Sequence, residues 1–197
     1  MKQGYFKRRF WKGVVAAGLF LALLPLSGFL PGCDELLEEV NVSELDNPTY
    51  RIFQGRLTYS TGESPPYKTL VGDLNRDGLN DIITLNSPGE TASVLLAQAG
   101  SYAEPVAYTV GTTPRNGLLA DLDGNGTQDL AVSNKDVDWI TLLFGVGDGT
   151  FGEPEGMALP EGSLPEEIVA ADLDGDGIID LLSSNEGTNS LALLKGE

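Results

Sequence analysis

The chain is 197 residues long and carries 29 acidic against 12 basic side chains, a formal net charge of −17 at pH 7. This excess of negative charge argues against nucleic acid and against an anionic membrane surface as partners. The sequence has no histidine and only one cysteine, so a Ser-His-Asp catalytic triad and an internal disulfide are both excluded.

The N-terminal segment is typical of a bacterial secretion signal. Residues 1–12 are basic, and residues 13–33 contain no charged side chain. The uncharged stretch ends in Leu-Pro-Gly-Cys, which is similar to a lipobox, so we expect residues 1–32 to be a lipoprotein signal peptide and Cys33 to be lipidated. An uncleaved transmembrane anchor is the alternative, since the stretch is long enough to span a bilayer, although the prolines and glycines within it disfavour this.

Residues 33–49 are acidic and polar, and we expect them to be a tether that precedes a folded domain at residues 50–197. Apolar runs in this domain are short and bounded by glycine, which favours strands over helices. The expected strands are residues 68–71, 81–85, 92–97, 117–120, 129–132, 139–144, 167–171, 180–182 and 190–194.

Three acidic loops of nine residues separate pairs of these strands, at residues 73–81 (loop 1), 121–129 (loop 2) and 172–180 (loop 3). Each has carboxylate or amide side chains at its first, third, fifth and ninth positions, and a glycine at the sixth that permits a sharp turn. Calcium takes six to eight oxygen ligands, which these four side chains and the backbone carbonyl of the seventh residue can supply. We therefore expect up to three Ca²⁺ ions, with the ligands Asp73, Asn75, Asp77, Leu79 and Asp81 in loop 1, Asp121, Asp123, Asn125, Thr127 and Asp129 in loop 2, and Asp172, Asp174, Asp176, Ile178 and Asp180 in loop 3.

The three loops differ in charge. Loop 3 has four carboxylates, whereas Asn125 replaces one in loop 2 and Asn75 replaces one in loop 1, where Arg76 also adds a positive charge. Because fewer negative ligands weaken binding, we expect affinity to fall from loop 3 to loop 2 to loop 1. An EF-hand is excluded, since none of the loops is followed by the glutamate that its twelfth position requires.

The loops belong to a longer repeat. Their first aspartates are 48 and 51 residues apart, and each loop precedes a similar order of strands and turns, which describes four-stranded propeller blades. Residues 144–151 read Phe-Gly-Val-Gly-Asp-Gly-Thr-Phe, and with the acidic loops they resemble the FG-GAP or VCBS repeat. The Phe-Gly part is degenerate in the first unit, at residues 96–102. The resemblance implies an all-β fold, a β-propeller-type array of about three four-stranded blades with calcium loops.

The resemblance also implies a function. Such repeats form the calcium-bearing blades of integrin α-subunit heads and of secreted bacterial proteins, where they present loops to proteins or glycans. We therefore expect an exported, non-enzymatic, calcium-binding module for adhesion, binding or scaffolding at the bacterial cell envelope, held to a membrane by lipid on Cys33, with a protein or glycan as its ligand. The alternative is a non-catalytic fragment or module of a calcium-dependent polysaccharide-processing enzyme. Trp139 is expected in the core rather than in a sugar site.

The third unit lacks an outermost strand, and residues 50–59 form a spare strand before loop 1. We expect residues 50–59 to pair with residues 190–195, because such pairing removes exposed strand edges. It closes an incomplete ring either within one chain or between two copies in a homo-oligomer.

Overall fold

A computed structural model describes residues 57–62 and 64–197. The chain divides after Leu57, and the features below belong to the unit Thr58–Glu197. The predicted signal peptide, the tether and Cys33 lie outside the described residues. None of the described residues belongs to a helix that is long and apolar enough to cross a membrane.

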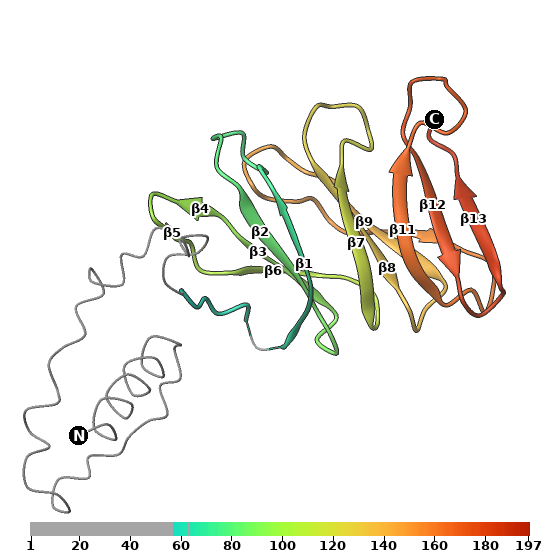
Figure 1. The fold of residues 1–197 in the computed structure, drawn as a ribbon, viewed down its shortest axis with the longest axis horizontal. Coiled ribbons are helices and arrows are strands. Elements are labelled where there is room, and N and C mark those ends of the chain that lie inside the picture. Colours follow the sequence, from blue (N-terminus) through green and yellow to red (C-terminus); the bar gives the residue numbers. More distant parts are fainter. Residues whose placement is uncertain (1–56, 63) are drawn as a thin grey trace, which may run out of the picture. The chain divides into compact units, whose positions relative to one another are not determined.

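The described residues form an all-β array of antiparallel sheets, and all nine expected strands are confirmed (Figure 1). The strands are β1 (Pro66–Gly72), β2 (Asp81–Asn86), β3 (Thr91–Leu95), β4 (Ala97–Gln98), β5 (Ser101–Tyr102), β6 (Val106–Thr109), β7 (Pro114–Ala120), β8 (Asp129–Asn134), β9 (Trp139–Leu143), β10 (Glu155–Ala158), β11 (Pro165–Ala171), β12 (Asp180–Asn185) and β13 (Ser190–Leu194).

These strands form three blades. Blade 1 has the strand order β1-β2-β3-β6, blade 2 has the order β7-β8-β9-β10, and blade 3 has β11-β12-β13. The short hairpin β4–β5 replaces the Phe-Gly turn in the degenerate first unit. Each inner strand, β1, β7 and β11, begins with proline, which is tolerated at the first residue of a strand because it needs no ladder N–H there.

Apolar cores lie between successive blades. We call the face of a blade that points toward the next blade in chain order its forward face, and the face that points toward the preceding blade its backward face. Blade 1 and blade 2 meet through side chains that are at most 1% exposed, namely Ile83, Ala92 and Val94 on one side and Leu130, Val132 and Leu143 on the other. Blades 2 and 3 meet in the same way, through Ala131, Ile140 and Leu142 and through Ile168 and Leu181. Burying one such valine, leucine or isoleucine side chain stabilises the fold by about 1.5–3 kcal/mol, so the blades depend on each other.

The expected ring closure is absent among the described residues. Of residues 50–59 only 57–59 are described; they form no strand, and the ring of Tyr59 packs edge-on against Tyr102 at 5.2 Å between centroids. In the described part of the chain β13 pairs with β12 alone, so the array is unclosed.

The prediction for Trp139 was wrong. The side chain is 43% exposed, because it opens β9 at the end of the sheet while the following four residues of the strand are buried.

Candidate metal centres

The three acidic loops lie at the same edge of the array, each as the turn between the first two strands of a blade (Figure 1). In each blade the pairing of the first two strands extends up to the loop, since Gly72 pairs with Asp81, Ala120 with Asp129 and Ala171 with Asp180. The antiparallel pairing therefore brings the two ends of each loop together, as the spacing of the aspartates predicted.

Loop 2 gathers three carboxylates. Oxygens of Asp121, Asp123 and Asp129 lie within 4.8 Å of one another. The turn depends on Gly126, which has a φ of +82° and donates its N–H to Asp121 Oδ2 at 2.9 Å. The other oxygen, Asp121 Oδ1, is buried and has no hydrogen-bond partner among the described residues. A buried, unpaired carboxylate oxygen is costly, and a cation held between these carboxylates would satisfy it.

Loop 3 also gathers three carboxylates within 4.8 Å, those of Asp172, Asp174 and Asp176. The ninth residue, Asp180, is not one of this group. Lys195 contributes a charge that the sequence did not predict at this site, since its Nζ donates to Asp174 Oδ2 at 2.6 Å and lowers the pKa of that carboxyl. Loop 3 is thus the richest in acids, but part of its charge is already balanced by an ammonium group.

Loop 1 forms no comparable group of three acids among the described residues. Asn75 Nδ2 donates to Asp77 Oδ2 at 3.0 Å, so one carboxylate is occupied within the loop. Arg76 has a φ of +60°, at a position where loops 2 and 3 have glycine. Its side chain extends toward loop 2 of the next blade, where Nη2 lies 3.3 Å from the point at which a Cβ on Gly126 would stand.

The ninth aspartate of each loop has a structural role that the sequence did not reveal. Asp81, Asp129 and Asp180 are at most 2% exposed. One oxygen of each accepts the N–H of the second loop residue, and the other accepts an N–H beyond the third strand. The donors are Leu74 (2.9 Å) and Ala97 (2.7 Å), Leu122 (2.7 Å) and Gly145 (2.8 Å), and Leu173 (2.9 Å) and Gly196 (3.0 Å).

Burial raises the pKa of Asp129, and the N–H donors of Gly145 and Leu122 oppose that rise. A neighbouring cation favours the ionised carboxylate in the same way as an N–H donor does.

The seventh residues, Leu79, Thr127 and Ile178, were expected to supply backbone carbonyls. Their N–H groups each donate to the side chain of the fifth residue, at 2.7, 2.7 and 2.8 Å. In this tight local turn, Asp77, Asn125 and Asp176 each use one side-chain oxygen to accept the N–H of the seventh residue. The other carboxylate oxygens, Asp77 Oδ2 and Asp176 Oδ2, do not accept that N–H.

The donor set of loop 2 fits a hard cation. It contains three gathered carboxylates, whose oxygens are ligands that Ca²⁺ prefers, and one of these residues, Asp121, has an oxygen without a hydrogen-bond partner among the described residues. Loop 3 supplies the same type of ligand. Loop 1 fits less well, because its three acids are not gathered and one is bound by Asn75.

Short antiparallel blades that pack face to face, each with an acidic turn at the same edge, define a β-propeller-like repeat protein. The FG-GAP-like repeat matches the sequence at residues 73–132 and again at 121–183, more than half of the chain. The chain belongs to the FG-GAP-like repeat family, as its loops and Phe-Gly turn predicted.

The structure described as "Crystal Structure of TcdB2-TccC3" aligns with a TM-score of 0.40 and 22% identity, over 59% of this chain and 6% of that chain. The chain therefore spans a small fraction of that protein's length. No curated protein matches the sequence.

Proposed function

We propose that this chain is a calcium-stabilised binding or scaffolding module, exported to the bacterial cell envelope. Membership of the FG-GAP-like repeat family supports a β-propeller-like module that binds or scaffolds. The observation that carries the calcium proposal is the centre in loop 2, where three carboxylates lie within 4.8 Å and Asp121 Oδ1 is buried without a partner.

The role of the cation is electrostatic. Two carboxylates about 4 Å apart repel by roughly 4 kcal/mol at an effective dielectric constant of about 20, so the gathered acids of loops 2 and 3 oppose the closed loop. Bound calcium would supply the compensating charge. The residues that would hold it in loop 2 are Asp121, Asp123, Asn125, Thr127 through its carbonyl, and Asp129. The closed loops in turn fix the first two strands of each blade, and with them the surfaces that a ligand would contact.

Calcium titration tests this proposal. At a concentration 100 times the dissociation constant, calcium should stabilise the chain by about 2.7 kcal/mol, which raises the Tm by about 10 °C over that in chelator. Asp123→Asn should remove most of the effect at loop 2. Glu153→Gln, an exposed acid outside the loops, is the matched control and should change nothing. Identical melting in chelator and in millimolar calcium would reject the proposal.

We propose binding rather than catalysis. Outside the loops, Glu166 is a described acid with two cationic partners, Lys135 and Arg115. Lys135 and then Arg115 lower the pKa of Glu166. A general acid at neutral pH needs a raised pKa instead. A glycan array and an affinity pull-down with the full chain would search for the protein or glycan ligand.

We also propose that lipid on Cys33 holds the chain to a membrane, on the basis of the lipobox-like Leu-Pro-Gly-Cys. Cys33→Ser should then abolish acylation, and the product should move from the detergent phase to the aqueous phase on phase partitioning. Asp34→Asn is the control, since it leaves the acylated thiol in place. Unchanged partitioning of Cys33→Ser would instead support an uncleaved anchor.

A further inference from the structure

Blade 3 has an apolar forward face that nothing in the described residues covers. Val169, Leu191 and Leu193 are 52%, 66% and 47% exposed, and Leu182 is half-buried between them. Register places these side chains together, because Leu182 pairs with both Val169 and Leu193.

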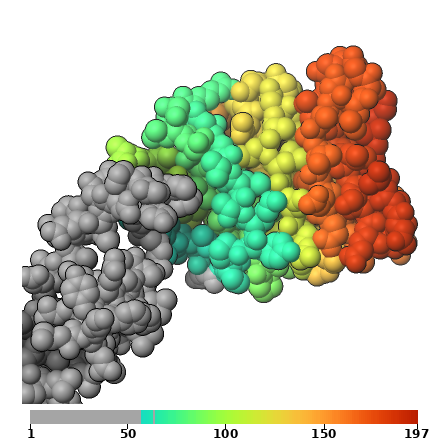
Figure 2. Space-filling model, in the orientation of Figure 1, coloured from blue at the N-terminus to red at the C-terminus, as the bar shows by residue number. Residues whose placement is uncertain are grey.

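The same positions are buried in the other two blades. Counted from the acidic loops, Leu191 and Leu193 correspond to Ala92 and Val94 in blade 1 and to Ile140 and Leu142 in blade 2. Those four side chains are at most 7% exposed, because the next blade covers them. Figure 2 shows blade 3, in orange and red, against blade 2 on one side only.

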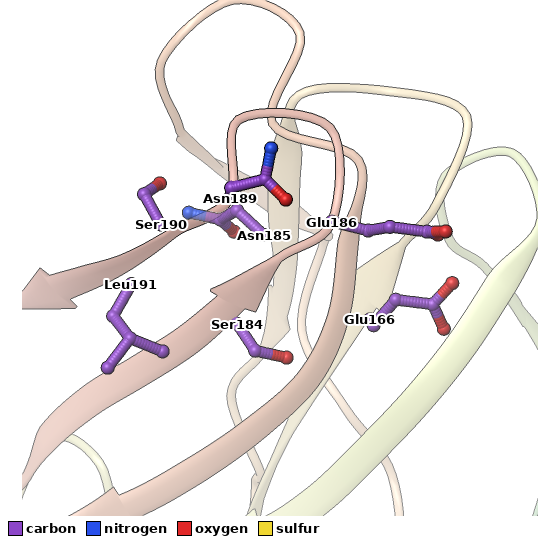
Figure 3. A pocket seen from close by; sticks show the side chains of 7 residues that line it. All are labelled: Glu166, Ser184, Asn185, Glu186, Asn189, Ser190 and Leu191. Atoms are coloured by element: carbon purple, nitrogen blue, oxygen red, sulfur yellow. The ribbon is translucent and has the colours of Figure 1, made fainter.

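A pocket adjoins this face (Figure 3). It has a volume of about 370 Å³ and is lined by Glu166, Ser184, Asn185, Glu186, Asn189, Ser190 and Leu191. Counted from the acidic loops, Glu166, Ser184 and Glu186 correspond to Arg115, Ser133 and Lys135 in blade 2. All three of these blade 2 residues contact blade 3. Arg115 and Lys135 pair with the Glu166 carboxylate, and Ser133 Oγ donates to the Glu166 carbonyl at 2.8 Å. The pocket therefore lies where a following blade would insert its side chains.

Blade 3 also has an open edge. The third strands of blades 1 and 2, β3 and β9, are covered by β6 and β10, which lead into the inner strand of the next blade. In the described part of the chain β13 has no such partner, so its outer N–H and C=O groups are free to pair with another strand.

The backward side of blade 1 has, among the described residues, an unpaired segment before its inner strand and an exposed apolar side chain, which complement the open edge and the apolar face of blade 3. Residues 58–61 precede β1 much as β6 precedes β7, yet they form no strand. Val71 is 60% exposed, whereas its equivalents Leu119 and Ala170 pack into the cores between blades.

We propose that the forward side of blade 3 docks blade 1 of a second copy of this chain. Residues 58–61 of the second copy pair with β13 as its outer strand, and its Val71 packs against Leu182 and Leu193. The contact repeats the two interfaces between blades of one chain. It is also reciprocal, since the first copy offers its own blade 1 to the second. In the single chain Tyr59 rests on Tyr102 at 5.2 Å, so pairing requires residues 58–61 to leave that position.

Sedimentation velocity tests the docking, with the full chain carrying Cys33→Ser in detergent and millimolar calcium. The chain should dimerise, and Leu193→Asp should raise the dissociation constant at least about 10-fold, because it places a charge in the apolar contact. Leu191→Asp should act likewise. Val106→Asp is the matched control, since Val106 is 54% exposed on β6, outside the proposed interface, and it should leave the dimer unchanged.

Amide hydrogen exchange gives a second readout. In the dimer, residues 58–61 and those amides of β13 that do not pair with β12 should be protected. Leu193→Asp should remove this protection from both, while the β12–β13 pairing and the other strands keep theirs. A wild-type chain that stays monomeric at all concentrations would overturn the proposal, as would dimers that persist in both aspartate variants. A monomer that protects the amides of β13 not paired with β12 would also overturn it, and would indicate an occupant other than a second copy.

Discussion

The third and the ninth residues of an acidic loop have different roles, which can be separated by experiment. Asp129 accepts two backbone hydrogen bonds, from Leu122 at 2.7 Å and Gly145 at 2.8 Å, and these contacts need no cation. Asp123, in contrast, is exposed and its hydrogen bonds stay within the loop. One residue fastens the loop to the end of the third strand, whereas the other offers its oxygens to a metal.

We predict that Asp129→Asn lowers the free energy of unfolding by about 1–3 kcal/mol even in chelator, because an amide nitrogen cannot accept the N–H that the carboxylate accepts. Asp123→Asn should have little effect in chelator and should reduce only the stabilisation by calcium. Urea denaturation of both variants, with and without calcium, measures the two contributions. Equal losses in chelator would contradict this division of roles.

In loop 3 the gathered acids are the first, third and fifth residues, which lie in one tight turn, so local sequence decides that they converge. In loop 2 the ninth residue takes the place of the fifth in the gathered group, and in loop 1 no such group forms among the described residues. The hydrogen bond from Gly145 to Asp129 could not be predicted in this way, since the two residues become neighbours only through the pairing of β8 with β9. The same holds for Lys195, which reaches loop 3 from 21 residues away, and for Arg76, which extends to the loop of another blade.

Among the elements, a buried asparagine ends the second strand of every blade. In blades 1 and 2 its Nδ2 donates to a hydroxyl on the third strand, from Asn86 to Ser93 and from Asn134 to Thr141, both at 2.8 Å. The equivalent hydroxyl position in blade 3 is Ala192, and the Nδ2 of Asn185 is buried without a partner among the described residues. Blade 3 therefore carries an unsatisfied donor that the other blades avoid.

Ala192→Ser should supply the missing acceptor. We predict a gain of about 0.5–1.5 kcal/mol in the free energy of unfolding, the usual net contribution of a hydrogen bond. Ala170→Ser is the matched control, because Ala170 packs against the same core and is not at the position equivalent to Ser93 and Thr141, and it should be neutral or destabilising. Thermal and urea unfolding of the two variants decide the matter, and a serine at position 192 that destabilises the chain would show that Asn185 needs no acceptor there.

The inner three strands of each blade were predictable because their apolar runs are short, buried and bounded by glycine. The outer strands were less so. All four residues of β10 are exposed, which leaves no apolar pattern for a strand to show. Blade 1 departs further, since residues without the Phe-Gly pattern form the additional hairpin β4–β5.

At the scale of the whole array, charged groups connect the blades at the ends of the inner strands away from the acidic loops. The Arg115 guanidinium lies 4.8 Å from the ring centroid of Tyr67 in blade 1, and its Nε donates to Glu166 in blade 3 at 2.8 Å. Lys135 of blade 2 binds both Glu166 and Glu186. Sequence alone gave no sign of this network, because its members are brought together only when the inner strands pack side by side.

We predict that this network makes the packing of blade 3 against blade 2 depend on pH. Lys135 and then Arg115 lower the pKa of Glu166 below its ordinary value of about 4.3. A carboxyl with a lowered pKa in the folded state stabilises the fold above its unfolded pKa, and this contribution is lost as the pH falls through the folded value. Glu166→Gln should therefore lower the Tm by about 2–4 °C at pH 7, and the difference from the wild type should shrink as the pH falls below about 4.

Glu167→Gln is the matched control, since Glu167 is an exposed neighbour on the same strand. Its Tm should follow that of the wild type across the whole pH range. Thermal scans from pH 3 to pH 7 at constant ionic strength measure all three proteins. Because the partners of Glu166 lie on blade 2, the loss should come from the contact between blades 2 and 3, so amide exchange in Glu166→Gln should quicken first in β11. A Tm difference that stays constant down to pH 3 would mean that Glu166 acts through packing and not through its charge.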